Sequence, residues 1–262
     1  MTTSDETMAV VRLVEELAAN AWPAEVTQTL DGWRLRFNGG VTSRANSVWA
    51  NADGGRVPLA ERLALVEDFY ARHGILPCYQ ITPAAQPVDL DEILARRGYV
   101  PHSFTLVETV ALAEVTAATA PPCSVDVALG ERPDDEWLAV YQAVEAVSDH
   151  ALAARQGILR RIGPRAGYAL ARLDGIAAGV GLGVVERGWL GVFCMGTLPA
   201  ARRRGVGASV LGALAAWALG EGASQAYLQV VAANAVARAL YESVGFAPLY
   251  EYHYRQRRTR SP

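Results

Sequence analysis

One segment near residue 200 joins the end of an expected strand to the start of an expected helix through a glycine-containing turn. It reads PAARRRGVGA over residues 199–208 and runs directly into the apolar stretch 209–219. Glycines let the backbone turn tightly and bring several N–H groups close to one ligand. A helix that begins there aims its unpaired N–H groups and the positive end of its dipole at the same point. The segment therefore predicts an anion site of the kind that holds phosphate or pyrophosphate.

Two common phosphate-binding patterns do not fit this loop. A P-loop requires a lysine after its second glycine, whereas all 24 basic residues of this chain are arginine. A dinucleotide-binding fingerprint requires a third small residue three positions after Gly207, where Val210 stands, and it also requires an early strand–helix–strand unit. The missing lysine excludes Schiff-base chemistry as well.

A second segment, NAVARALYESVGF over residues 234–246, follows a predicted buried strand and reads as a short helix. Asn234 is a good N-cap, and Gly245 fits the left-handed position after a helix end. An apolar residue at every fourth position, from Val236 to Val244, predicts a stripe that faces the core. Tyr241 points roughly 100° away from this stripe. We therefore expect its phenol at an edge where it could face a cleft.

Together the two segments resemble the motifs of the GNAT superfamily of N-acyltransferases. The first motif, R/Q-x-x-G-x-G/A after a strand that ends V-x-P, is matched by Arg202, Gly205 and Gly207, with residues 197–199 at the strand end. The second motif, N-x-x-A-x-x-L-Y-x-x-x-G-F, is matched by Asn234, Ala237, Leu240, Tyr241, Gly245 and Phe246. The resemblance covers about residues 122 to 254.

The resemblance implies an acyl-CoA cosubstrate, with acetyl-CoA favoured, and assigns roles to particular residues. Backbone N–H groups around the loop would hold the pyrophosphate. The strand before the loop would pair with the pantetheine arm and polarise the thioester carbonyl. Tyr241 would protonate the departing thiolate, and Asn234 would reach the cofactor as well as cap its helix. The implied cofactor-binding residues are Met195, Gly196, Thr197, Arg202, Arg203, Arg204, Gly205, Val206, Gly207, Ala208 and Asn234, and no metal is expected.

The general base is not identified by either motif. The family often places a carboxylate on a central strand, but the predicted strand 189–197 contains no acidic residue. Cys194 in that strand is interpreted as a small core residue, because the superfamily generally transfers the acyl group directly. The candidates for the base, each of a type more often found on surfaces and turns, are Glu145, Asp149, His150, Glu186 and, through water, Glu251.

The order of predicted elements indicates an α/β (α+β) protein of two tandem GNAT-like lobes, each a mixed, mostly antiparallel sheet flanked by helices. Residues 122–262 read β-α-α-β-β-β-α-β-α-β and form the expected catalytic lobe, after a linker at 116–123. Residues 1–115 are interpreted as a degenerate copy without a cofactor site. Their loop 51–56 lacks the R-x-x-G-x-G pattern, and Leu94 stands where the second motif has its tyrosine. An unrelated α/β extension is the alternative.

Composition restricts the remaining possibilities. The chain has 262 residues, 51% hydrophobic and 19% charged, with a net charge of −3, which favours a globular protein and not nucleic-acid binding. The acidic N-terminus lacks a signal-peptide pattern, and no apolar run reaches the ~18 residues of a membrane span. The three cysteines lack metal-ligand spacing, so we expect a cytoplasmic protein without a metal. The arginine-rich tail 255–260 is expected to be a solvated end.

These observations predict an N-acetyltransferase that moves an acetyl group from acetyl-CoA to a primary amine by direct attack. Two alternatives stay open at this point: transfer of a different acyl group, and a binding or sensor module that holds acyl-CoA without turnover. No motif identifies the amine, and a monomer and a homodimer are both compatible with the sequence.

Overall fold

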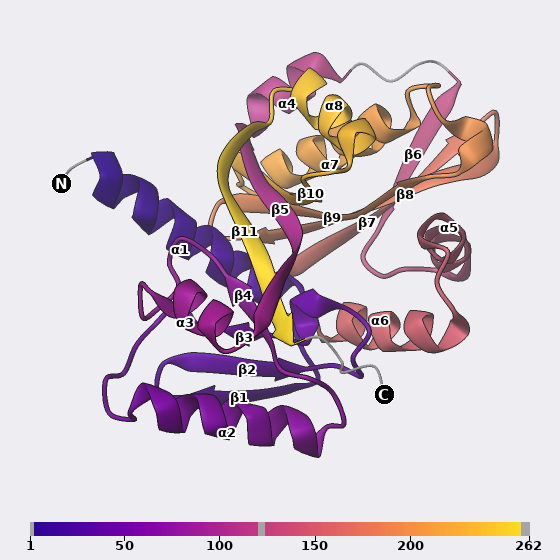
Figure 1. Ribbon diagram of the computed structural model, residues 1–262. Coiled ribbons are helices and arrows are strands. Elements are labelled where there is room, and N and C mark those ends of the chain that lie inside the picture. The colour runs from indigo at the N-terminus through magenta and orange to yellow at the C-terminus, as the bar shows by residue number, and fades with distance from the viewer. Residues whose placement is uncertain (1–2, 120–123, 258–262) are drawn as a thin grey trace. The chain divides into compact units, whose positions relative to one another are not determined.

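The computed structural model describes residues 3–119 and 124–257, which form two compact units along an interleaved chain (Figure 1). Within these residues, unit 1 comprises 3–106, 153–161 and 250–257, and unit 2 comprises 107–152 and 162–249. Unit 1 therefore includes two segments from the second half of the sequence, and unit 2 begins within the first half.

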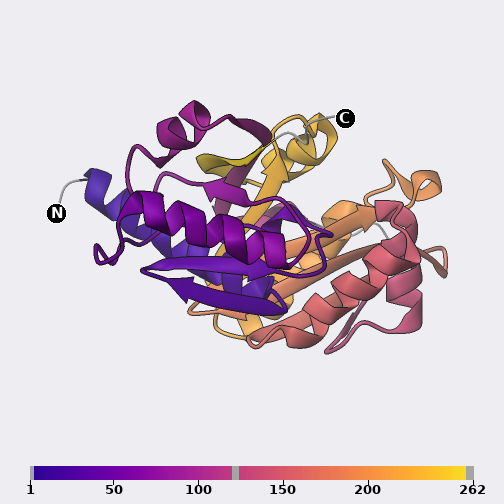
Figure 2. The ribbon, with the colours of Figure 1, turned by 60° about the horizontal axis from the view of Figure 1, so that its bottom comes forward.

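Unit 1 is a small sheet with helices from the first half of the chain. Its strand order is β1-β2-β3-β4-β11, in which only β3 and β4 are parallel neighbours among the pairs described. Helix α2 lies against β1 and β2 (Figure 2). The elements from this half are α1 (Thr3–Ala21), β1 (Val26–Leu30), β2 (Trp33–Phe37), the 3₁₀ helix η1 (Ser43–Ala45), β3 (Val48–Trp49), α2 (Leu59–Arg72), β4 (Cys78–Ile81), α3 (Leu90–Arg96) and β5 (Tyr99–Ala111).

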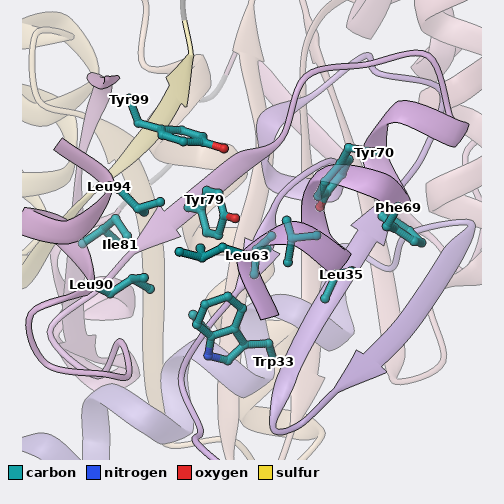
Figure 3. Packing of buried hydrophobic residues seen from close by; sticks show 13 residues of the cluster. Trp33, Leu35, Leu63, Phe69, Tyr70, Tyr79, Ile81, Leu90, Leu94 and Tyr99 are labelled. Carbon is teal, nitrogen blue, oxygen red and sulfur yellow. The ribbon is translucent and has the colours of Figure 1, made fainter. Parts of the chain in front are cut away.

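The core of unit 1 explains why these segments adopt these elements. The apolar side chains of α2 recur at helical spacing, and Leu63, Phe69 and Tyr70 are buried against the sheet. Trp33 from β2 and Leu94 from α3 lie in the same cluster (Figure 3). Leu94 is thus a fully buried core residue of this unit.

Unit 2 contains the loop and both sequence motifs. Its strand order is β5-β10-β9-β8-β7-β6, with β9 and β10 parallel and with β6, β7, β8 and β9 successively antiparallel. The elements from the rest of the chain are α4 (Leu112–Ala118), β6 (Val125–Gly130), α5 (Asp135–Glu145), α6 (Asp149–Arg161), β7 (Arg165–Leu173), β8 (Ile176–Glu186), β9 (Trp189–Thr197), the 3₁₀ helix η2 (Pro199–Ala201), α7 (Val206–Gly220), β10 (Gln225–Val231), α8 (Ala235–Ser243) and β11 (Ala247–Arg257).

Helices α5 and α7 cover opposite faces of this sheet. Neighbouring residues of a strand point to opposite faces. On β7, Tyr168 contacts the Trp137 ring of α5, whereas a Cβ at Gly167 would meet Trp217 of α7 at 3.1 Å. A Cβ at Gly181 of β8 would approach Val210 of α7 to 2.5 Å. Glycine in these strands therefore allows α7 to pack closely on the sheet.

The two halves of the chain repeat one order of elements, which confirms the tandem GNAT fold. The first half runs β1–β2–β3–α2–β4–α3–β5, and the second runs β7–β8–β9–α7–β10–α8–β11. The last strand of each half is exchanged. Strand β11 lies next to β4, and β5 lies next to β10. This exchange could not be read from the sequence.

Several local elements differ from the sequence-based expectations. Helix α1 and strand β1 were not predicted. Strand β1 is largely exposed, so its residues do not alternate between buried and exposed positions. The predicted linker beginning at 116 is wrong in part, because α4 occupies Leu112–Ala118. Residues 120–123 of that linker, including Cys123, and the tail beyond 257 lie outside the described residues. In the described part of the chain, no helix has the length and apolar character needed to cross a bilayer.

Candidate active site

A cavity of about 930 Å³ in unit 2 brings both sequence motifs together. Every predicted site residue except Arg204 lines it. The lining residues are Val144, Met195, Gly196, Thr197, Ala201, Arg202, Arg203, Gly205, Val206, Gly207, Ala208, Asn234, Val236, Ala237, Ala239, Leu240, Tyr241 and Ser243.

The loop before α7 has the geometry of an anion cradle. Gly205 adopts a left-handed conformation (φ +81°), which turns the chain into the helix. The first helical hydrogen bond runs from the Ser209 N–H to the Gly205 carbonyl at 2.9 Å. The N–H groups of residues 206–208 therefore precede the helical ladder and have no acceptor within it. They lie where the helix dipole also favours negative charge.

The three arginines of the loop have different surroundings. Arg202 and Arg203 line the cavity and are exposed. The Arg202 Nε donates to the Thr197 carbonyl at 3.4 Å. Arg204 instead pairs with Asp174, with 2.9 Å between Nη2 and Oδ2. Its guanidinium is thus engaged at the surface, and of the three loop arginines Arg202 and Arg203 contribute side-chain charge to the cavity wall.

Strand β9 separates from β10 at the cavity. Their parallel register extends from the pair Gln225–Trp189 to the pair Leu228–Val192 and is not continued beyond it in the described residues. A register shift in the pairing with β8 and the positive φ of Cys194 (+51°) mark a bulge at this point. Residues 195–197, which follow the bulge, line the cavity.

Gly196 allows helix α5 to form part of the same wall. A Cβ at this position would lie 2.5 Å from Cγ1 of Val144. Any larger residue would push the two elements apart and change the shape of the cavity where β9 separates from β10.

Helix α8 forms another wall, and its orientation corrects the predicted stripe. The Asn234 side chain accepts from the Ala237 N–H at 3.1 Å, so the predicted N-cap is confirmed. Gly245 has φ +98°, as predicted for the end of the helix. Val236, however, is 77% exposed and lines the cavity instead of the core. Leu240 also lines the cavity, whereas Val244 at the end of α8 is buried in the core as predicted.

Tyr241 is more buried than its predicted place at an edge suggested. The side chain lines the cavity, is 8% exposed and packs edge-on against Phe246 with 5.9 Å between ring centroids. Burial, with a smaller contribution from the negative charge of Glu108, raises the pKa of Tyr241 to about 12. The phenol is therefore protonated at neutral pH.

Glu108 is a buried acidic residue that sequence reasoning missed. It lies on β5 next to β10, is 4% exposed, and its Oε2 has no hydrogen-bond partner among the described residues. Burial raises its pKa, Arg238 opposes this rise and Glu242 adds to it. Residues 238, 241 and 242 share one side of α8. Glu108 thus faces the side of α8 on which Tyr241 lies.

The base candidates read from the sequence lie elsewhere. Glu145, Asp149 and His150 are exposed around the end of α5 and the start of α6, and the Asp149 carboxylate accepts from Gln142 at 2.8 Å. Glu186 lies at the end of β8, and Glu251 is an exposed residue of unit 1. None of these five lines the cavity, and Glu108 is not a lining residue either, although it faces α8 beside Tyr241. Cys194 is half-buried at the bulge of β9.

The fold and the cavity define the class of protein as a tandem GNAT acyltransferase. Solved structures share the fold over nearly the whole chain. A GCN5-related N-acetyltransferase from Kribbella flavida has a TM-score of 0.68 at 18% identity and covers 96% of this chain and 95% of its own. A tandem GNAT protein from the clavulanic acid biosynthesis pathway has a TM-score of 0.63 at 15% identity and covers 93% and 86%.

Sequence comparison places the chain within one family of that class. The chain belongs to the family described as probable histone acetyltransferase Rv0428c, C-terminal, whose model matches residues 8–257. An uncharacterized N-acetyltransferase of Bacillus subtilis, YobR, is 30% identical over 95% of this chain and 99% of its own length. The probable histone acetyltransferase Rv0428c of Mycobacterium tuberculosis is 29% identical over 91% of this chain and 71% of its own.

Proposed function

We propose that this protein transfers an acetyl group from acetyl-CoA to a primary amine by direct attack, with the chemistry in unit 2. The observation that carries the proposal is the meeting of three features in one cavity. These are the N–H cradle at the start of α7, the separated backbone of β9 and the phenol of Tyr241. A site that only stored acyl-CoA would have no use for a proton donor beside the separated strand.

The residues of the cavity fit the parts of acetyl-CoA. The N–H groups of 206–208, with Arg202 and Arg203, would hold the pyrophosphate. The backbone of 195–197 would pair with the pantetheine arm and place an N–H near the thioester carbonyl, where it stabilises negative charge on the oxygen. Asn234, which lines the cavity and caps α8, would contact the cofactor as well. In the described part of the chain, no cluster of His, Cys, Asp and Glu could hold a metal ion.

We assign the Glu108 carboxylate as the general base, and because it does not line the cavity it acts through water. An acceptor ammonium gives one proton to Glu108, and the neutral amine then attacks the thioester carbonyl. As the C–S bond breaks, Tyr241 gives its proton to the departing sulfur. The second proton lost from nitrogen restores Tyr241, and Glu108 releases its proton to solvent. The products are the N-acetyl amine and the thiol of CoA.

Thiol release in the presence of amines tests this function. The purified full-length chain is mixed with acetyl-CoA and, separately, with an aminoglycoside, a polyamine, an amino acid and a peptide with a free N-terminus and lysine. The peptide is included because one relative is named a probable histone acetyltransferase. Amine-dependent thiol release with a matching acetylated product supports the proposal.

Two alternatives predict different outcomes in the same assay. Faster release from a longer acyl-CoA than from acetyl-CoA would identify a different acyl group. Tight acetyl-CoA binding without thiol release for any amine would support a sensor. The proposed setting is the cytoplasm, where the cosubstrate and small amines are both present.

A further inference from the structure

The turn between β1 and β2 inserts a carboxylate at the start of helix α2 in unit 1. The Asp31 Oδ2 accepts from the backbone N–H groups of Arg56 at 3.0 Å and Val57 at 2.9 Å. It also accepts from Nη2 of Arg62 at 2.9 Å. The Asp31 side chain is only 2% exposed. The hydrogen bond from Val57 is the largest cause that holds the pKa of Asp31 below its usual range, so this group is an anion at neutral pH.

The surroundings of this carboxylate are those of a built anion site. The Arg62 side chain is 3% exposed, and its guanidinium lies 4.8 Å from the Trp33 ring centroid. Its Nε and Nη1 are buried without a hydrogen-bond partner in the described residues. Asp53 shares Nη2 of Arg62 at 2.7 Å, and Arg56 reaches Asp31 from the solvent side. Two consecutive N–H groups and a buried cation thus converge on one anion.

This site lies in the loop of unit 1 that corresponds, in the repeated order of elements, to the cavity loop of unit 2. In unit 1 the loop between β3 and α2 holds the Asp31 carboxylate. In unit 2 the loop between β9 and α7 lines the cavity. Both loops leave a strand that pairs in parallel with the strand after the helix. The carboxylate therefore binds, in unit 1, the loop that corresponds to the cavity loop of unit 2, although its N–H donors lie just before the N-cap Pro58 and those of unit 2 lie just after the N-cap Gly205.

We infer that unit 1 retains an oxyanion cradle and that its own Asp31 carboxylate fills it. The natural ligand class of such a cradle is phosphate or pyrophosphate. The internal carboxylate competes at a high effective concentration, because the β1–β2 turn holds it in place. The loop also closes around it. A Cβ at Gly54 would lie 2.0 Å from the Asp31 Oδ1. Unit 1 thereby excludes a second cofactor.

Removing the carboxylate should turn this closed site into one that accepts an external anion. Asp31 has φ +45°, a conformation that glycine adopts without strain. Asp31→Gly empties the cradle and keeps the turn, whereas Asp31→Asn removes the charge and leaves the cradle filled. Both variants are made in the full chain with Gly207→Glu, so that phosphate cannot occupy the loop of unit 2.

The measurement is thermal unfolding in inorganic phosphate against chloride of equal ionic strength. We expect phosphate to raise the Tm of the Asp31→Gly protein by roughly 5 °C when its concentration is about 100-fold above Kd. The Asp31→Asn protein and the Gly207→Glu parent should show no such difference. If Asp31→Gly does not fold in chloride, refolding in phosphate decides the matter. Phosphate-dependent recovery supports the inference, and equal behaviour in both salts overturns it.

Discussion

Replacing Tyr241 by phenylalanine isolates the proposed acid from the rest of the cavity. The change removes one hydroxyl and keeps the ring, so the contact with Phe246 at 5.9 Å between centroids is retained. We expect kcat to fall about 100-fold, which corresponds to about 2.7 kcal/mol of transition-state stabilisation. The Kd for acetyl-CoA should change less than about threefold, because the hydroxyl acts only as the C–S bond breaks.

The raised pKa of Tyr241 limits how readily its phenol gives a proton to the departing thiolate. Burial places that pKa at about 12. A thiol has a pKa of about 8.5 in water, so complete proton transfer between them in water would be uphill by about 3.5 units, or about 4.8 kcal/mol. Burial in the same cavity also raises the pKa of the CoA thiol, which reduces the difference between its pKa and that of Tyr241. The phenol can therefore assist in the transition state without being a strong acid. It should cause no fall in rate up to about pH 10.

Pre-steady-state thiol release and calorimetry measure the two quantities separately. Tyr79→Phe is the matched control, because it removes a buried phenol of unit 1 that does not line the cavity. That variant should keep the wild-type kcat. The reasoning is refuted if Tyr241→Phe retains kcat within twofold of wild type, or if its lost activity is fully explained by weaker acetyl-CoA binding.

Two further substitutions test the cradle and the base. Gly207→Glu places a carboxylate among the N–H groups of the loop and displaces Leu240, whose Cδ2 would lie 2.9 Å from the new Cβ. It should abolish acetyl-CoA binding by calorimetry, whereas Gly220→Glu at the open end of α7 should leave the affinity unchanged. In a plot of kcat/KM against pH, Glu108→Gln should remove the rise on the acidic side, called the acidic limb. A base acts when deprotonated, so the rate rises with pH through a pKa that burial sets above the usual range of glutamate. Glu242→Gln should keep that limb, and a limb that persists in Glu108→Gln would reject the assignment.

The parts of the site that the sequence could predict are those encoded over short distances. The cap at Asn234 and the left-handed Gly245 follow from residue type and position within one helix. The cradle before α7 follows from two glycines and an apolar run. Each depends on interactions among neighbours in the chain, for which one stretch of sequence contains all the information.

The missed features depend on residues far apart in the chain. Glu108 lies 133 positions before Tyr241, in the half assigned to the other lobe, and reaches the catalytic unit only because β5 is exchanged. Nothing in the alternation of β5 distinguishes a glutamate buried beside a helix from a solvated one. The exposure of Val236 was missed for a related reason. An apolar stripe that lines a cavity has the same spacing as one that faces a core.

The strand exchange leads to a prediction about truncated forms of the protein. A fragment of residues 116–262 would lose the end of β5 next to β10, together with Glu108 and the start of α4. It would also lose the hydrogen bond from the Leu112 N–H to the Ser224 carbonyl at 3.0 Å. Strand β10 would then be an edge strand with unpaired backbone N–H and C=O groups, which favours aggregation.

We therefore expect the fragment 116–262 to be insoluble or inactive, and the fragment 107–262 to recover more soluble, acetyl-CoA-binding protein. The second fragment restores the missing part of the unit 2 sheet and differs from the first by only nine residues, 107–115. Solubility, circular dichroism and acetyl-CoA stoichiometry compare the two with the full chain, which should bind one cofactor. Equal behaviour of the two fragments would show that the β5 segment does not support unit 2. A soluble and fully active 116–262 fragment, or two cofactors bound per full chain, would reject the division of labour in which one half supplies the cofactor site and the other supplies a strand and the base.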